Sequence, residues 1–271
     1  MKINAYAKIN LTLDVLSKRE DGYHNLDSVM QTVSLHDTVF VTKAKEISVF
    51  CNNKSVTGKD NIAYTAANKF FVATGLQGGA KIRIKKRIPM AAGLGGGSSD
   101  AAAVIIALDK IYKTHLSRQK LIDIAKFVGA DVPFLLFGGI ARMGGIGEII
   151  EPLEKMFPYY VLLIKAENKG STGQMYSLIE KKEKSNALTQ EFINSLSNGK
   201  TEQKYVGNDF LSVAPQDDLI ARIKETFPIC VSLSGSGPTV FALYENKKSV
   251  KNALKQLKKS GYSPIITKFC E

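Results

Sequence analysis

The chain has 271 residues, 44% hydrophobic and 23% charged, which fits a soluble globular enzyme of one large or two medium domains. Its 37 lysines and arginines exceed its 25 aspartates and glutamates, so the net charge is +12. This excess favours anionic partners such as nucleic acid, an acidic membrane surface or a phosphorylated metabolite, but a lysine-rich solvated surface explains it equally well. No apolar run reaches the roughly 18 residues that a bilayer-spanning helix needs.

The cysteines and the N-terminus indicate a reducing, cytoplasmic setting. Cys51, Cys230 and Cys270 are far apart and odd in number, and they show neither a metal-ligand spacing nor a disulfide framework. Polar residues interrupt the N-terminal stretch "MKINAYAKINLTLDV", so it lacks the apolar core of a signal peptide.

The first 90 residues predict strands around one helix. Residues 3–16 alternate, with one apolar face and one polar face (Lys8, Asn10, Thr12 and Asp14), as in a half-buried strand. A turn-rich loop at 19–26 and one or two strands within 27–44 follow. Residues 60–75 predict a helix capped by Asp60 or Asn61 and ended by Gly75. Residues 80–89 predict a strand with Ile82 and Ile84 facing inward.

Two further helices are predicted before residue 130. The first, at 98–112, would be capped by Ser98 or Ser99, with Asp100 favourable in its first turn. The second, at 116–129, would be capped by Ser117 and stopped by Gly129.

The pattern starts afresh near residue 150, which predicts domains at 1–150 and 151–271. The polar stretch 195–209 is the loosest connection of the second domain. Its predicted elements are a strand at 159–165, helices across 172–197 and at 217–226, strands at 230–235 and 238–245, a helix at 248–259 and a strand at 263–269.

The loop "GLGGGSSD" at 93–100 is the strongest chemical signal. It has no lysine, which a Walker A loop needs, and Ser98 stands where a dinucleotide fingerprint needs its third glycine. Glycines nevertheless let backbone N–H groups converge on an anion, and the helix that follows adds its positive end. A tight strand-to-helix turn would need only one or two glycines, so the loop favours phosphate binding.

Three motifs in this order resemble those of the GHMP kinases. They are "AYAKINLTLDV" at 5–15, "PMAAGLGGGSSDAAA" at 89–103 and "SLSGSGPTVFAL" at 232–243. The resemblance implies an α+β, GHMP kinase fold of two domains, with a ribosomal-protein-S5-domain-2-like N-terminal ATP-binding domain and a ferredoxin-like C-terminal domain. It also implies an active site in the cleft between them.

The stretch 7–39, with its "DGYH", narrows the resemblance to one branch, as do "GADVPFLLFGG" at 129–139 and "GIGE" at 145–148. Members of this branch use ATP to phosphorylate the 2-hydroxyl of CDP-methylerythritol, a step of the non-mevalonate isoprenoid route. The resemblance implies ATP as phosphoryl donor with Mg²⁺, and a cytoplasmic monomer or weak homodimer without a nucleic-acid or membrane partner.

The site residues follow from the resemblance, one position at a time. The catalytic pair would be Lys8 and Asp131, with the aspartate as general base. ATP would contact Pro89, Met90, Ala91, Ala92, Gly93, Leu94, Gly95, Gly96, Gly97, Ser98 and Ser99. Asn61 and Ile62 would lie on the adenine side of ATP, and Lys86 would lie near the adenine base. The other substrate would contact Asn10, Tyr23, His24, Tyr176, Gly235 and Gly237. The Mg²⁺ ligands are not identified, although Ser98 or Ser99 is a candidate.

Several of these residues have a plainer interpretation. Asp131 stands at a helix-capping position, Lys8 resembles a surface lysine, Gly235 and Gly237 suit a hairpin turn, and Tyr176 suits a core. Tyr6 stands where the superfamily commonly has proline. Arg142 lies in a region that is near the cleft in related enzymes, and the sequence gives it no role.

Three other functions compete with this one. A GHMP kinase for homoserine or phosphomevalonate is disfavoured by "DGYH", because those substrates have no nucleobase. A basic nucleic-acid-binding protein would explain the charge but not the glycine motifs. A Rossmann oxidoreductase is disfavoured by Ser98.

Overall fold

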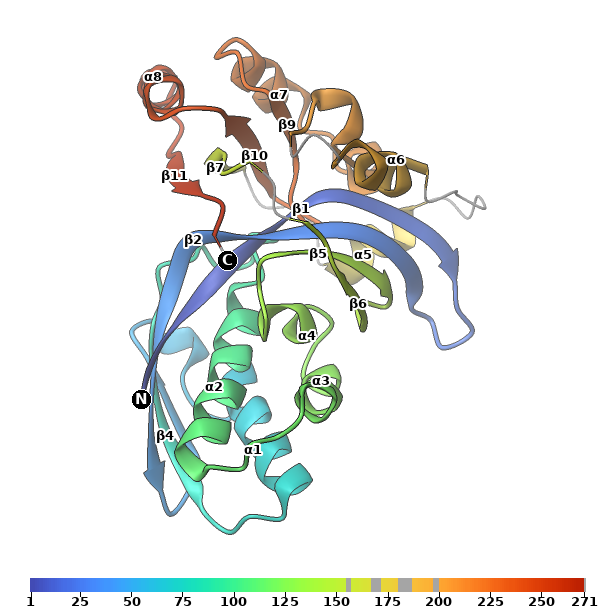
Figure 1. Cartoon of the computed structure of the whole chain (residues 1–271). Coiled ribbons are helices and arrows are strands. Elements are labelled where there is room, and N and C mark those ends of the chain that lie inside the picture. The colour runs from blue at the N-terminus through green and yellow to red at the C-terminus, as the bar shows by residue number, and fades with distance from the viewer. Residues whose placement is uncertain (155–156, 167–171, 180–186, 197–199, 271) are drawn as a thin grey trace. The chain divides into compact units, whose positions relative to one another are not determined.

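A computed structural model describes residues 1–154, 157–166, 172–179, 187–196 and 200–270 (Figure 1). The chain forms two compact units. Unit 1 comprises Met1–Ala7, Leu35–Met90 and Gly95–Gly138, and unit 2 comprises Lys8–Ser34, Ala91–Leu94 and Gly139–Glu271. A single cut near residue 150 does not describe these units, because β1 (Lys2–Lys18) and β2 (His24–Ala44) each contribute to both. The assignment of ATP binding to 1–150 stays a prediction.

Unit 1 is a sheet with helices packed against it. Strand β4 (Gly79–Lys85) lies between β2, to which it is antiparallel, and β3 (Ser48–Cys51), to which it is parallel. The inward side chains of β4, among them Ile82 and Ile84, are buried as predicted. They pack in one core with the buried faces of four helices (Figure 1). These helices are α1 (Ile62–Thr74), α2 (Gly96–Tyr112), α3 (Arg118–Lys126) and α4 (Val132–Leu135). The short 3-10 helix η1 (Lys54–Val56) precedes α1 in the chain.

The ends of α1 and α3 follow the predicted capping chemistry. Asn61 Oδ1 accepts a hydrogen bond from Ala63 N at 2.8 Å, and Gly75 ends α1 in the left-handed conformation. Ser117 caps α3 as predicted. That helix ends at Lys126, and Gly129 N still bonds to the carbonyl of Ala125. The predicted stop at Gly129 was therefore late by about one turn.

Helix α2 begins earlier than predicted. Its N-cap is Gly95, with φ of 67° and no side-chain cap, and Gly96 and Gly97 form its first turn. The predicted serine cap is wrong because Ser99 Oγ instead donates a hydrogen bond to the carbonyl of Tyr6 at 2.7 Å. Asp100 lies beyond the first turn and is buried, so its predicted role at the helix dipole is also wrong.

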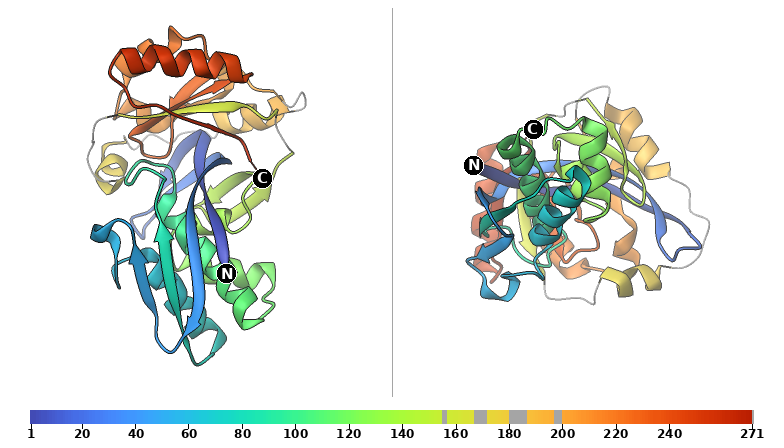
Figure 2. Two further views of the ribbon diagram at one scale, coloured as in Figure 1. Left: turned by 90° about the vertical axis from the view of Figure 1, so that its left-hand side faces the viewer. Right: turned by 90° about the horizontal axis from the view of Figure 1, so that it is seen from below.

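Unit 2 contains an antiparallel sheet in the order β11-β7-β10-β9. Figure 2 shows α8 (Lys247–Lys259) lying across it, and α7 (Asp217–Lys224) also packs on this sheet. Its strands match those predicted and are β7 (Tyr160–Lys165), β9 (Cys230–Leu233), β10 (Thr239–Tyr244) and β11 (Ile265–Lys268). Of the helices predicted across 172–197, α5 (Thr172–Leu178) and α6 (Ala187–Ser195) are present, and 180–186 and 197 lie outside the described residues.

The rest of unit 2 is built on β1 and β2. Strand β2 is one long strand where one or two were predicted, and it begins at His24, inside the predicted loop. It pairs with β5 (Ile140–Gly145), which pairs with β6 (Ile149–Pro152). The segment predicted as a loose connection contains η3 (Gln203–Tyr205), β8 (Gly207–Asn208), which pairs in parallel with β1, and the start of η4 (Asp209–Ser212).

The polar face of β1 is the main departure from the predicted strand. Lys8, Asn10, Thr12 and Asp14 are each no more than 5% exposed, so both faces of this strand are buried. The sequence predicted a half-buried strand because alternation alone does not show what covers the polar side. Buried polar groups need hydrogen-bond partners, and those of β1 define the candidate site.

Two further expectations concern cysteines and membranes. All three cysteines are free thiols. Among the described residues, no helix is long and apolar enough to cross a membrane.

Candidate active site

Lys8 and Asn10 are the centre of a hydrogen-bonded network in unit 2. Lys8 Nζ donates to Asn10 Oδ1 at 2.7 Å, and the same oxygen accepts from Gly235 N at 2.9 Å. Asn10 Nδ2 donates to Ser28 Oγ at 2.8 Å, and Ser28 Oγ donates to the carbonyl of Thr12 at 2.6 Å. Ser28 therefore sets the direction of the Asn10 amide, whose oxygen holds both Lys8 and Gly235.

Part of the first glycine loop contacts this network. Lys8 N donates to Leu94 O at 3.0 Å, and Ser234 Oγ donates to Gly93 O at 2.9 Å. Gly93 has φ of 73°, and a Cβ there would lie 2.2 Å from the carbonyl oxygen of Ser234. Only glycine allows this close approach of the two loops.

The second glycine loop is a hairpin turn between β9 and β10, as its plainer interpretation predicted. Gly237 N donates to Ser234 O at 2.9 Å, and Gly235 and Gly237 both have positive φ. Asn208 Nδ2 holds the turn through Leu233 O at 2.8 Å and Gly235 O at 2.9 Å. Because Gly235 N also reaches Asn10, the turn belongs to the candidate site as well.

The same strand face continues to the start of α6. Thr12 Oγ1 lies 2.8 Å from Thr189 Oγ1, and Thr189 N donates to Asp14 Oδ2 at 2.9 Å. Burial raises the pKa of Asp14, and the hydrogen bonds from Thr189 oppose that rise. All four polar side chains of this face are thus hydrogen-bonded, which explains how β1 tolerates their burial.

In unit 1, Lys86 lies in a buried ion cluster with Asp37 and Asp100. Its Nζ is 2.8 Å from Asp100 Oδ2 and also contacts Asp37 Oδ2. Asp37 Oδ1 accepts from Arg87 N, and from Ile88 N at 2.8 Å, just before the glycine loop. Burial lowers the pKa of Lys86, but the two carboxylates outweigh it and the pKa is raised. Burial raises the pKa of Asp100 to about 7, although Lys86 opposes the rise.

The starts of α1 and α2 lie close together in unit 1. A Cβ on Gly97 would be 3.4 Å from Ile62 Cγ2, and one on Gly129 would be 3.6 Å from Ile62 Cδ1 and 3.9 Å from Ser98 Oγ. The predicted residues Ile62 and Ser98 are thereby brought together with the segment before Asp131. Two helix N-termini at one place favour an anion there.

Asp131 occupies the N-cap position of α4 but makes no side-chain cap. Its backbone φ of −81° and ψ of −14° are already helical, unlike the extended backbone of a typical capping residue. The predicted cap is therefore wrong.

Two of the predicted substrate-binding aromatic residues contact each other in unit 2. The His24 and Tyr176 rings are stacked with centroids 5.3 Å apart, and Tyr176 meets Phe210 edge to face at 4.8 Å. Burial, and then the charge of Lys18, lowers the pKa of His24. Tyr23 is 62% exposed. Tyr176 thus has both a stacking contact and a place at the edge of the core.

Arg142 and Tyr6 also have defined contacts. Arg142 donates to both carboxylate oxygens of Asp27, at 2.9 and 2.6 Å. Such a bidentate pair beside Ser28 ties β5 to β2. Strand β1 runs through Tyr6, whose ring meets His36 edge to face at 5.4 Å.

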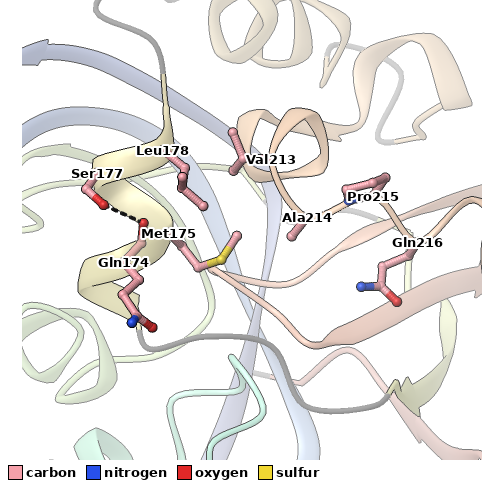
Figure 3. Close-up of a pocket in the computed structure, with 8 residues that line it drawn as sticks. All are labelled: Gln174, Met175, Ser177, Leu178, Val213, Ala214, Pro215 and Gln216. Atoms are coloured by element: carbon pink, nitrogen blue, oxygen red, sulfur yellow. Dashed lines mark hydrogen bonds between the residues drawn. The ribbon is translucent and has the colours of Figure 1, made fainter.

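A separate pocket of about 570 Å³ lies between α5 and the segment 213–216 (Figure 3). Gln174 and Gln216 supply amides to its lining and Ser177 a hydroxyl, but the lining has no charged side chain. It is poorly suited to phosphate, and none of its residues was predicted as a site residue.

Comparisons with known proteins agree with the motifs. The family descriptions "GHMP kinases N terminal domain" and "GHMP kinases C terminal" match residues 61–139 and 210–263. The 4-diphosphocytidyl-2-C-methyl-D-erythritol kinase of Thermoanaerobacter pseudethanolicus is 39% identical over 95% of this chain and 92% of its own. The enzyme of that name from Caldicellulosiruptor bescii is 37% identical over 100% of this chain and 99% of its own.

The chain belongs to the 4-diphosphocytidyl-2-C-methyl-D-erythritol kinase family of GHMP kinases. A crystal structure of 4-(cytidine 5'-diphospho)-2C-methyl-D-erythritol kinase matches with a TM-score of 0.83 and 30% identity over the whole of both chains. The mevalonate kinase of Methanococcus jannaschii, 16% identical over 100% of this chain and 98% of its own with a TM-score of 0.74, shares the fold. The predicted α+β GHMP kinase fold is confirmed.

The sequence motifs of this kinase family did not reveal every residue of the Lys8 network or of the Lys86 cluster. Ser28, Asn208 and Asp37 were missed because each acts through hydrogen bonds to residues distant in sequence. Ser28 is one of many polar residues in β2 and had no distinctive signal. Asn208 had none, because it lies in a polar stretch.

Proposed function

We propose that the protein transfers the γ-phosphoryl group of ATP to the 2-hydroxyl of 4-diphosphocytidyl-2-C-methyl-D-erythritol. The products are the 2-phosphate and ADP, and the reaction is a step of the non-mevalonate isoprenoid route. Beyond family membership, the observation that carries the proposal is the buried Lys8 network, in which one amide oxygen holds both Lys8 Nζ and the N–H of Gly235.

Lys8 supplies fixed positive charge in this proposal. Phosphoryl transfer needs mainly positioning and charge stabilisation, and a cation whose place is set beforehand needs no reorganisation during the reaction. Lys8 is 3% exposed, and its side chain is oriented by Asn10, whose direction is in turn set by Ser28. An ammonium held in this way suits the oxygens of a transferring phosphoryl group.

Asp131 accepts the proton of the 2-hydroxyl as the phosphoryl group arrives. The assignment rests on the match of "GADVP" to the family motif. Asp131 lies at the start of α4 in unit 1, with helical backbone angles.

The ATP phosphates bind along residues 89–99. The glycines there supply backbone N–H groups, and the adjacent N-termini of α1 and α2 supply positive potential. Asn61 and Ile62 lie at the start of α1, which suits their proposed place beside adenine. Lys86, which is proposed to lie near the adenine base, has its Nζ in contact with Asp37 and Asp100.

The cytidine end of the other substrate binds at Tyr23, His24 and Tyr176. Stacking of a base on an aromatic side chain is worth about 1–3 kcal/mol. The His24–Tyr176 stack provides such a face on flat rings that are already parallel within 20°. Asn10, Gly235 and Gly237 would contact the part of this substrate nearest to Lys8.

The described part of the chain does not build a cage for Mg²⁺. Among the described residues, no group of three or more His, Cys, Asp or Glu side chains could hold a metal ion. In kinase sites Mg²⁺ binds chiefly to substrate phosphates and water, so the ion would arrive with ATP. Ser99 Oγ donates to Tyr6 O, and contact of Ser98 or Ser99 with the ion stays a prediction.

The direct test is an ADP-release assay with three acceptors. We expect turnover with 4-diphosphocytidyl-2-C-methyl-D-erythritol and none with homoserine or phosphomevalonate. Turnover of either alternative alcohol, without turnover of the cytidine substrate, would replace the proposal.

Asp131→Asn should keep its fold by circular dichroism and lose turnover by orders of magnitude, and near-normal turnover would remove the general-base role.

A further inference from the structure

The outward face of strand β4 carries a row of cations in unit 1. Lys81, Arg83 and Lys85 are exposed, whereas the residues between them, Ile82 and Ile84, are buried. Among the described residues, no carboxylate forms an ion pair with any of these three cations. The row therefore presents uncompensated positive charge.

Two phenylalanines flank this row on the neighbouring strands. Arg83 is in register with Phe40 of β2 on one side and with Phe50 of β3 on the other. Phe40 is 36% exposed and Phe50 is 48% exposed. The Nζ of Lys81 lies 5.6 Å from the centre of the Phe50 ring. Large apolar rings are thus interleaved with cations on one sheet face.

Hydroxyl groups complete the outer face. Lys81 is in register with Thr42 of β2, which is exposed, and with Ser48 of β3, which is half-buried, whereas Thr38, in register with Lys85, is buried. These outward positions on β2 and β3 contain no acidic residue. Rings for stacking, cations for phosphates and hydroxyl groups for sugar are the three kinds of group that sheet-type RNA-binding domains use.

We propose that this face of unit 1 binds single-stranded RNA, with bases stacked on Phe40 and Phe50 and phosphates beside Lys81, Arg83 and Lys85. The two phenylalanines stand on strands separated by β4, so their backbones are about 10 Å apart from the usual strand spacing. That distance accommodates two splayed bases with the connecting phosphate over Arg83. Hydroxyl groups beside Lys81 favour RNA over DNA through its 2′-hydroxyl.

The lysine-rich helix α8 of unit 2 provides the contrast. Helix α8 has six lysines, but it has no aromatic residue. It offers charge without a stacking surface, so it attracts any polyanion weakly and in a salt-dependent manner. Equal charge removals on β4 and on α8 therefore separate a built site from the general effect of a net charge of +12.

The test is fluorescence anisotropy of a labelled oligouridylate titrated with the full-length protein at about 50 and 200 mM salt. Because two stacking contacts are lost, we expect F40A/F50A to weaken binding by about tenfold or more. F40L/F50L, which keeps apolar area without rings, should behave like the alanine variant. R83Q should weaken binding and lower the salt slope by about one, whereas K255Q on α8 should change affinity less than about twofold.

Kinase turnover and circular dichroism should be unchanged in all these variants, because none of the substituted residues belongs to the candidate active site. The proposal is overturned if F40A/F50A binds RNA as the wild type does, or if K255Q weakens binding as much as R83Q. Equal affinity for a DNA oligomer of the same length would also overturn it, as would equal competition by polyphosphate or anionic lipid vesicles. Concentration-dependent dimerisation that F40A/F50A abolishes would assign the face to a second copy of the chain instead.

Discussion

Lys8 in unit 2 has a neutral amide among its partners, whereas Lys86 in unit 1 is bound by two carboxylates. Lys8 Nζ is oriented by the neutral amide oxygen of Asn10, which also binds the Gly235 N–H. Lys86 Nζ contacts the carboxylates of Asp37 and Asp100. A cation oriented by a directional amide is held in one place relative to the glycine loops. A cation between two carboxylates mainly neutralises them.

Burial of a lysine therefore does not by itself indicate catalysis. Both side chains are largely buried, at 3% and 11% exposed. The Lys86 cluster fixes the strand end before the glycine loop and the body of α2, since Asp37 binds two backbone N–H groups there. We therefore expect changes at Lys86 to affect stability first, and changes at Lys8 to affect the rate first.

Lys86→Met should give the largest effect on stability. It leaves Asp37 and Asp100 buried without their cation, and breaking such a buried pair typically costs about 3–5 kcal/mol. Urea unfolding should show this loss in the free energy of unfolding. Lys86→Met/Asp100→Asn should recover part of it, because one buried carboxylate is then removed. A single variant as stable as the wild type would show that the cluster does not support the fold.

Lys8→Met should give the largest effect on rate. Loss of one preorganised electrostatic contact in an active site typically lowers kcat by about 10²–10³-fold. Methionine keeps much of the buried hydrocarbon of lysine, so the melting temperature should fall less than in Lys86→Met. Steady-state kinetics and thermal melts of both variants form a matched pair. The contrast fails if Lys86→Met lowers kcat as much as Lys8→Met while remaining folded.

Local sequence signals predicted much of unit 1 and most of the second half of the chain. Asn61, Gly75 and Ser117 act at helix ends as expected because capping depends on residues within one turn. The individual strands of the four-stranded sheet of unit 2 were predicted because they are short, apolar and separated by clear turns.

The errors share one cause, which is competition from distant partners. Ser99 does not cap α2 because the Tyr6 carbonyl takes its hydroxyl hydrogen. Asp100 pairs with Lys86 instead of the helix dipole. The polar face of β1 is covered by Ser28, Thr189 and the 234–235 turn, none of which a periodicity reveals. Catalytic assignments needed the family motifs, because a lone lysine or aspartate has no distinctive pattern.

Ser28→Ala should lower kcat by about tenfold, which corresponds to about 1.4 kcal/mol. Without the hydroxyl, the Asn10 amide loses the partner that fixes its direction, so the oxygen no longer points reliably to Lys8 and Gly235. KM for ATP should change little. Ser28→Thr keeps the hydroxyl and should restore kcat, whereas equal loss in both variants would indicate a packing defect.

The Lys86 cluster should also make the stability of the fold depend on pH. The pKa of Asp100 is about 7 in the folded protein and 3.8 for an ordinary aspartate, so between these values the folded state holds the proton and the unfolded state does not. The contribution of Asp100 to the free energy of unfolding is therefore fully present below about pH 3.8 and is lost as the pH rises through about 7. Asp100→Asn removes this titration. The free energy of unfolding of the wild type, measured relative to that variant, should fall between about pH 5 and pH 8. A constant difference across that range would show that Asp100 stays ionised beside Lys86, as in an ordinary salt bridge.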